Sequence, residues 1–268
     1  MYIKWGENMK IPMYQVDAFT GEIFKGNPAA ICILEEWIDD KLMQNIAMEN
    51  NLSETAFCIV KEDICELRWF TPEEEIDLCG HATLATAFVI FEILNYPSNK
   101  IKFTTQSGIL EIEKDGENII MEFPSREGVK AEITEQLIKG LGKEPKEVYE
   151  SRDLMVVYDN EQDIKDLNPN MEELKLIDTF GIIVTSKGKE VDFVSRYFAP
   201  SCGVSEDPVT GSAHCTLVPY WSKILGKKKL VAKQLSKRGG ILQCEASLDK
   251  VKISGKAKLF FKGEIYLT

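Results

Sequence analysis

Apolar and polar residues partly alternate along Met13–Phe19, a pattern typical of a half-buried strand. A different pattern fills Gly80–Asn95, where almost every position is apolar, and it predicts a buried helix. Asp115 and Gly116 stand between two apolar runs and indicate a hairpin turn. Together these patterns predict a strand-rich chain whose sheets curl around buried helices.

One order of patterns occurs twice. Arg68–Pro72 (RWFTP) matches Arg196–Pro200 (RYFAP) in residue type at each place, and each follows an apolar strand. Each is followed by a glycine that opens a new segment, Gly80 in the first copy and Gly211 in the second. The connection from proline to glycine is three residues longer in the second copy, a difference that a loop tolerates. A repeat this long indicates a duplicated domain rather than a solenoid.

The segments upstream of these motifs correspond as well. A strand at Ala29–Leu34 and a helix near Asp39–Glu49 match a strand at Leu154–Tyr158 and a helix near Met171–Leu176. The prediction is an α/β (α+β) fold of two pseudo-symmetric domains, each a mixed sheet rolled around a central helix. We place these domains at 1–125 and 126–268, and the last strand of the chain could return to the first domain.

The two central helices have different expected starts and lengths. The first is expected to begin at Gly80 and the second at Gly211. Pro219 lies within the second and should kink it or limit its length, because proline lacks a backbone N–H.

The composition indicates an acidic globular protein. The 268 residues carry a net charge of −11, which argues against nucleic acid or an anionic membrane as a partner, because both attract basic surfaces. The seven cysteines form no CxxC pair, so neither a disulfide framework nor a structural zinc site is expected, and the reducing cytoplasm is favoured. No apolar run reaches the length of about 18 residues that a membrane helix needs.

Two short segments argue against further classes of function. Met1–Lys10 lacks the apolar centre of a signal peptide and is interpreted as an upstream extension. The FKGNP segment at Phe24–Pro28 has a single glycine and is not a convincing phosphate loop.

Gly80 and Gly211 are the first candidates for a binding site. A helix start offers unpaired N–H groups and partial positive charge, so it can hold an anion such as a carboxylate, and Ser212 adds a hydroxyl donor. The alternative is that these glycines only cap tight turns. The only two histidines, His81 and His214, lie beside them, which favours a functional site at one or both.

Carboxylates supply the candidate chemistry. Glu54 stands at the entry to an apolar strand, where packing gains nothing from it, and Asp178 is its expected counterpart in the second half. A carboxylate in a partly closed pocket can act as general base and then acid. Asp77 and the pair Glu206–Asp207 precede the two glycines, although acidic residues also favour helix starts on dipole grounds alone.

Cys79 precedes Gly80, and a thiolate there would be favoured by the helix dipole. A two-thiol racemase would need a second cysteine at the matching place before Gly211. That place holds Pro208–Thr210, so the two-thiol mechanism is the weaker alternative.

Three segments carry a resemblance to a known family. They are NLSETAF at 51–57, RWFTPEEEIDLCGHATLATAF at 68–88 and RYFAPSCGVSEDPVTGSAHCTLVPYW at 196–221. The chain resembles the PhzF-like phenazine-biosynthesis isomerases, whose fold is similar to that of diaminopimelate epimerase, with the site between two alike domains. The resemblance implies proton transfer without metal or organic cofactor, on a small carboxylate substrate, in a possible homodimer.

The resemblance also assigns roles to residues. It implies Glu54 as the acid/base, with Asp207 and His81 assisting. It also implies Gly80, Gly211 and Ser212 as the residues that bind the carboxylate of the substrate, and Ser53 as a further substrate-binding residue. Two alternatives stay open: an epimerase or racemase that uses Cys79, and a non-catalytic carboxylate-binding protein on the same fold.

Overall fold

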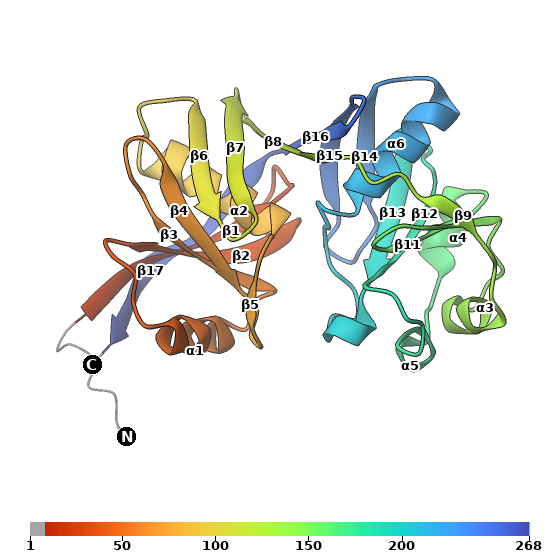
Figure 1. The fold of residues 1–268 in the computed structure, drawn as a ribbon, viewed down its shortest axis with the longest axis horizontal. Coiled ribbons are helices and arrows are strands. Elements are labelled where there is room, and N and C mark those ends of the chain that lie inside the picture. Colours follow the sequence, from red (N-terminus) through yellow and green to blue (C-terminus); the bar gives the residue numbers. More distant parts are fainter. Residues whose placement is uncertain (1–8, 268) are drawn as a thin grey trace. The chain divides into compact units, whose positions relative to one another are not determined.

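The computed structural model describes residues 9–267, so the predicted extension at 1–10 lies almost wholly outside the described residues. The chain divides into two compact units (Figure 1). Unit 1 holds the described residues up to Phe24, then Pro28–Met121 and those from Lys256 onward. Unit 2 holds Lys25–Asn27 and Glu122–Gly255.

The sheet of unit 1 begins with its last strand in sequence, because β17 pairs antiparallel with β1, which also pairs with β2. From there β2 and β3 are parallel, β3 and β4 antiparallel, β4 and β6 parallel, and β6, β7 and β8 successively antiparallel. The short strand β5 pairs antiparallel with β4. The strands are β1 (Met9–Ala18), β2 (Asn27–Leu34), β3 (Glu54–Ile59), β4 (Cys65–Phe70), β5 (Glu75–Ile76), β6 (Lys100–Thr105), β7 (Gly108–Asp115), β8 (Asn118–Pro124) and β17 (Ala257–Leu267).

Unit 2 repeats this order of pairings. After the antiparallel pairs β9–β10 and β10–β11, strands β11 and β12 are parallel, β12 and β13 antiparallel, β13 and β14 parallel, and β14, β15 and β16 antiparallel. The strands are β9 (Val129–Ala131), β10 (Glu147–Glu150), β11 (Leu154–Val157), β12 (Ile182–Lys187), β13 (Phe193–Phe198), β14 (Lys229–Gln234), β15 (Gly240–Ala246) and β16 (Lys250–Gly255).

Each sheet packs on one central helix (Figure 1). In unit 1, α2 contacts β1, β3 and β17, and in unit 2, α6 contacts β14, β15 and β16. Every side chain of α2 from His81 to Ala87 is buried, as expected for a helix that is apolar almost all round. The helices are α1 (Asp40–Asn50), α2 (Gly80–Phe88), the π-helical turn η1 (Val89–Ile93), α3 (Glu135–Leu141), α4 (Glu161–Asp166), α5 (Met171–Leu174), the 3₁₀ turn η2 (Pro200–Cys202) and α6 (His214–Leu225).

Several predicted elements are confirmed. The strand expected at Met13–Phe19 coincides with β1 as far as Ala18, and the turn at Asp115 and Gly116 joins β7 to β8. Gly116 has φ of +59°, a conformation that glycine adopts without strain. The buried helix expected over Gly80–Asn95 begins at Gly80 and ends in the wider turn η1.

The start predicted for the second central helix is wrong. Helix α6 begins at His214, three residues after Gly211. Residues 211–213 form tighter turns instead, because the N–H groups of His214 and Cys215 donate to the carbonyls three residues back, Gly211 and Ser212, at 3.0 and 3.1 Å. Sequence composition does not separate such a turn from the helix that follows it.

Pro219 does not end α6, which continues to Leu225. Proline leaves the carbonyl four residues back, that of Cys215, without its helical donor. The backbone N–H of Arg126 donates to that carbonyl at 2.9 Å. A neighbouring segment therefore satisfies the acceptor, and the helix tolerates the proline.

The predicted domain ranges, 1–125 and 126–268, stay a prediction. The compact units differ from those ranges mainly in two segments: β17 pairs with β1 and belongs to unit 1, and Lys25–Asn27 belong to unit 2. Among the described residues no helix combines the length and the apolar character that a membrane crossing requires.

Candidate active site

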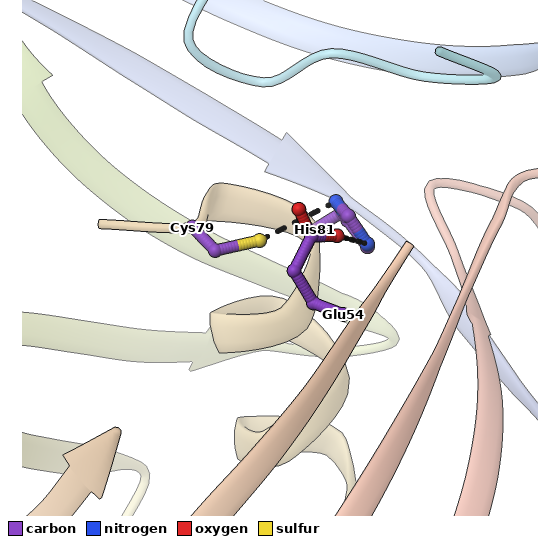
Figure 2. A group of neighbouring side chains, drawn as sticks. All are labelled: Glu54, Cys79 and His81. Atoms are coloured by element: carbon purple, nitrogen blue, oxygen red, sulfur yellow. Dashed lines mark hydrogen bonds and ion pairs between the residues drawn. The ribbon is translucent and has the colours of Figure 1, made fainter. Parts of the chain in front are cut away.

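Glu54 is the first residue of β3 and lies opposite Ala29 of the parallel strand β2. Its side chain is 16% exposed. Helix α2 packs against β3 and brings its second residue, His81, to this carboxylate, with Nε2 of His81 3.0 Å from Oε2 of Glu54 (Figure 2). The structure thus brings together two residues that the sequence indicated separately.

Cys79 completes this cluster in unit 1. It is the N-cap residue of α2 in an extended conformation, and its Sγ lies 3.6 Å from Nδ1 of His81. In Figure 2, dashed lines join one ring nitrogen of His81 to the thiol and the other to the carboxylate. The Cys79 side chain makes no capping hydrogen bond to the helix, so the thiol is turned toward His81 rather than toward the first N–H groups of α2.

The protonation states of this cluster follow from burial and neighbours. Burial lowers the pKa of His81, but the adjacent Cys79 and the Glu54 carboxylate raise it by more, and the net pKa lies well above the ordinary value. Burial, aided by the Glu54 carboxylate, raises the pKa of Cys79. Burial thus favours the thiol form of Cys79, which is a poor proton acceptor, and the negative charge of the Glu54 carboxylate favours the protonated form of the His81 ring.

Glu54, Cys79 and His81 could also hold a metal ion, since one ligand atom from each lies within 4.8 Å of the others. Thiolate, imidazole and carboxylate are ligands that Zn²⁺ accepts. The described residues contain no other such group. The ring places its two nitrogens against different partners, an arrangement that suits proton transfer between side chains.

Asp207 lies in unit 2 within a buried polar network. Its Oδ1 accepts a hydrogen bond from Nδ2 of Asn27 at 2.8 Å, and its Oδ2 accepts one from the hydroxyl of Thr210. The fully buried side chain of Gln234 bridges the backbone, accepting from the N–H of Thr210 at 2.8 Å and donating to the carbonyl of Asp207 at 2.7 Å. These bonds fix the carboxylate beside the turn that contains Gly211.

The two copies of the RxFxP motif are held by equivalent ion pairs. Arg68 binds Glu75, seven residues later, and Arg196 binds Glu206, ten residues later, each through two nitrogens. The extra three residues therefore lie between arginine and glutamate. Glu206 has a structural role, and from it onward the copies align without a gap, so Thr210 is the equivalent of Cys79.

The prediction that Asp178 is the counterpart of Glu54 is wrong. Strand pairing places Thr55 opposite Phe70 in unit 1 and Ile182 opposite Phe198 in unit 2. The residue equivalent to Glu54 is therefore Gly181. The residues directly before β3 and β12 differ between the two halves, and no sequence pattern reveals which of them are equivalent.

His214 does not share the role of His81. Its Nδ1 donates to the carbonyl of Thr210 at 2.9 Å, so the ring is the Nδ1–H tautomer. Thr83, at the equivalent place in unit 1, makes the same bond to the carbonyl of Cys79. Burial lowers the pKa of His214 to about 4, and the ring is a neutral support for the Thr210–Gly211 turn.

The remaining predicted residues lie next to these groups. Gly80 opens α2 directly before His81, and Ser53 precedes Glu54. Ser212 accepts a hydrogen bond from Nη2 of Arg152 at 3.2 Å. Asp77, by contrast, is exposed and bound by Ser107, apart from the clusters above.

Sequence reasoning missed three polar residues: Asn27, Arg152 and Gln234. Asn27 belongs to the FKGNP segment, whose single glycine argues against a phosphate loop. The usable signal is an asparagine at the first position of an apolar strand. Arg152 and Gln234 lie far in sequence from the motifs they contact, and only the fold brings them there.

Comparison with known proteins identifies the family. The family model of phenazine biosynthesis-like proteins, PhzC-PhzF, matches residues 16–263. A Pseudomonas aeruginosa protein named an uncharacterized isomerase is 46% identical over 259 residues, which cover 97% of this chain and 100% of that protein. The crystal structure of a PhzF-family protein from Enterococcus faecalis is 49% identical with a TM-score of 0.95, covering 97% of this chain and 100% of its own.

A more distant likeness concerns the fold alone. A hydroxyproline epimerase from Agrobacterium vitis is 8% identical with a TM-score of 0.66, and the match covers 99% of this chain and 94% of that one. The predicted family and the predicted α/β fold of the epimerase type are confirmed. The chain belongs to the PhzC-PhzF family of phenazine biosynthesis-like proteins, and it is an isomerase.

Proposed function

We propose that this isomerase moves a proton from one carbon to another within a small carboxylate substrate, with Glu54 as the acid/base. The observation that carries the proposal is the contact between Glu54 and His81, with Oε2 and Nε2 3.0 Å apart and the Glu54 side chain 16% exposed. The ring holds one oxygen of a carboxylate, the type of side chain that can accept a proton from carbon and return it. The remaining exposure leaves room for a ligand to reach it.

The other residues take roles around this proton carrier. His81 orients the Glu54 carboxylate and stabilises its charge. Asp207, fixed by Asn27 and Thr210, assists at the substrate. Gly80, Gly211 and Ser212 are the residues assigned to the carboxylate of the substrate, and Ser53 is a further substrate-binding residue. That the two glycines serve one ligand stays a prediction, as do the homodimer and the cytoplasmic location.

The chemistry needs no cofactor in this proposal. A carboxylate can remove a proton from carbon when a neighbouring carboxylate or unsaturation stabilises the resulting charge, and it can return the proton after the double bond has moved. Glu54 then accepts the proton from one carbon and donates it to another, and the enzyme ends the cycle unchanged.

The test is Glu54→Gln in a deuterium-exchange assay with a panel of small unsaturated carboxylates. Removal of a positioned acid/base should lower the exchange rate by about 10²- to 10⁴-fold. Glu62→Gln, in the exposed loop after β3, is the matched control and should keep the wild-type rate. An unchanged rate in Glu54→Gln would exclude Glu54 as the acid/base. Tight carboxylate binding without any deuterium incorporation by the wild type would favour the non-catalytic alternative.

A further inference from the structure

Unit 2 lacks a carboxylate at the place that Glu54 occupies in unit 1. That place belongs to Gly181, and a Cβ there would lie 2.1 Å from the hydroxyl oxygen of Tyr197. The phenol therefore fills the space that a larger side chain would take. Its hydroxyl donates to Oδ1 of Asp153 at 2.9 Å, and Asp153 is fully buried. In place of a carboxylate equivalent to Glu54, unit 2 therefore has the hydrogen-bonded pair Tyr197 and Asp153.

Arg152 is the exposed member of this group. Its Nη2 lies 3.2 Å from the hydroxyl oxygen of Ser212, and 3.5 and 3.4 Å from Oδ1 and Oδ2 of Asp153. The two contacts with Asp153 are long for charge-assisted hydrogen bonds. The guanidinium also lies over the ring of Phe180, 4.3 Å from its centroid. These contacts fix the guanidinium of Arg152 and leave most of its N–H donors without a hydrogen-bond partner among the described residues.

Arg152 keeps donors that its contacts do not use, and a second arginine lies near the same thiol, that of Cys215. Within the described part of the chain, no hydrogen bond or ion pair uses Nε or Nη1 of Arg152, whose side chain is 34% exposed. Arg126 carries a second guanidinium nearby, and its buried Nη1 has no hydrogen-bond partner among the described residues. Burial raises the pKa of the Cys215 thiol to about 11, the charges of both arginines oppose that rise, and the Asp153 carboxylate adds to it.

We propose that Arg152, together with Ser212, holds a carboxylate group of an organic anion on unit 2. The free Nε–H and Nη1–H groups donate to the anion, and the Ser212 hydroxyl, which accepts from Nη2, keeps its own proton for donation. Asp153 and Phe180 orient the guanidinium. That this anion is the substrate rests on the proposed function, whereas its binding does not.

This assignment gives the two units different tasks. A buried carboxylate such as Asp153 is costly unless it is paired and hydrogen-bonded, so a chain gains little by keeping one without a further use. Here Asp153 fixes the direction of an arginine that reaches solvent. Unit 1 has a reactive carboxylate at Glu54. In unit 2 the equivalent residue is Gly181, and the space beside it is filled by Tyr197, which contacts Asp153, the residue that orients Arg152.

The experiment measures binding of benzoate and of its neutral analogue benzamide by calorimetry, in the wild type, Arg152→Met and a control. The control, Lys223→Met, also removes one positive charge, but from an exposed ion pair with Glu127 near the end of α6. Arg152→Met should bind benzoate about 10- to 100-fold more weakly, because charge-assisted bonds are lost. Lys223→Met should bind as the wild type does.

Two results would overturn the proposal: wild-type affinity for benzoate in folded Arg152→Met, or a wild type that binds benzoate no better than benzamide. If Arg152→Met fails to fold, Arg152→Gln replaces it, because glutamine keeps polar contacts while removing the charge, and the same criteria hold. Deuterium exchange by Glu54→Gln separates this proposal from the proposed function. Unchanged exchange there removes the role of Glu54 and leaves the anion site standing.

Discussion

Nε2 of His81 lies 3.0 Å from Oε2 of Glu54, and this contact joins the second residue of a buried helix to the first residue of a strand. Neither residue is on a long loop. Pairing with β2 fixes the backbone of Glu54, and packing of α2 against the sheet fixes that of His81. The geometry is therefore set by the core of unit 1, which is how a rigid reactive group is best supported.

The raised pKa of His81 predicts a loss of stability at high pH. The folded state keeps a proton that the unfolded chain releases near pH 6.5, so the stabilisation is complete below that pH and disappears as pH rises through the folded pKa. His81→Gln retains a donor near the place of Nε2 but does not titrate. The free energy of unfolding, measured in urea, should fall with rising pH in the wild type and much less in His81→Gln. Parallel curves would contradict the assigned protonation.

His214 predicts the opposite dependence, at acidic pH. Its folded pKa of about 4 lies below the ordinary value, so between pH 6.5 and 4 the unfolded chain binds a proton that the folded state does not. The free energy of unfolding should fall by about 3 kcal/mol over this window through His214 alone. His214→Asn can still donate to the Thr210 carbonyl and does not titrate, so it should be less sensitive to acid. Equal sensitivity in both proteins would refute the neutral role.

Cys79 is predicted to be dispensable for proton transfer. Its raised pKa keeps it a thiol, and its equivalent in unit 2 is Thr210, so a pair of thiols is not available at these places. Cys79→Ala should keep the exchange rate within about tenfold, because a missing acid/base costs about 10²-fold or more. Cys244→Ala, at another buried cysteine, controls for lost packing. A 10²-fold loss confined to Cys79→Ala would instead support the epimerase alternative.

Gln234 is predicted to hold the segment that carries Asp207. Gln234→Leu would leave the Thr210 N–H and the Asp207 carbonyl without the partners they have now, at a cost of about 1–3 kcal/mol for a buried polar group. The free energy of unfolding should fall by that amount, and exchange activity should fall with it. Gln243→Leu, at an exposed position on β15, should change stability by no more than about 0.5 kcal/mol. Equal stability of the two variants would contradict this role.

The elements that the sequence predicted well are those with a strong local signal. The apolar stretch after Gly80 predicted a buried helix, and the repeated RxFxP motif predicted two halves of similar design. Glu54 and His81 were found because one is a charge at the start of an apolar strand and the other is one of two histidines. In each case the pattern itself contains the physical reason.

The errors have physical causes that the sequence does not display. Gly211 opens a turn rather than a helix, because three residues with tight bonds precede His214. The sequence pattern aligned Asp178 with Glu54, but the strand register shows that Gly181 occupies the equivalent position. Arg152 depends on contacts with Ser212, 60 residues away, and only tertiary structure reveals such a contact.

The central claim is that Glu54 carries the proton. The most direct measurement follows solvent deuterium by NMR as it enters a small unsaturated carboxylate turned over by wild-type and Glu54→Gln protein. Matched unfolding curves would establish that both proteins are folded. The account predicts deuterium at the newly protonated carbon with wild-type protein and a rate about 10²- to 10⁴-fold lower with Glu54→Gln. Deuterium incorporation at the wild-type rate by folded Glu54→Gln would contradict it.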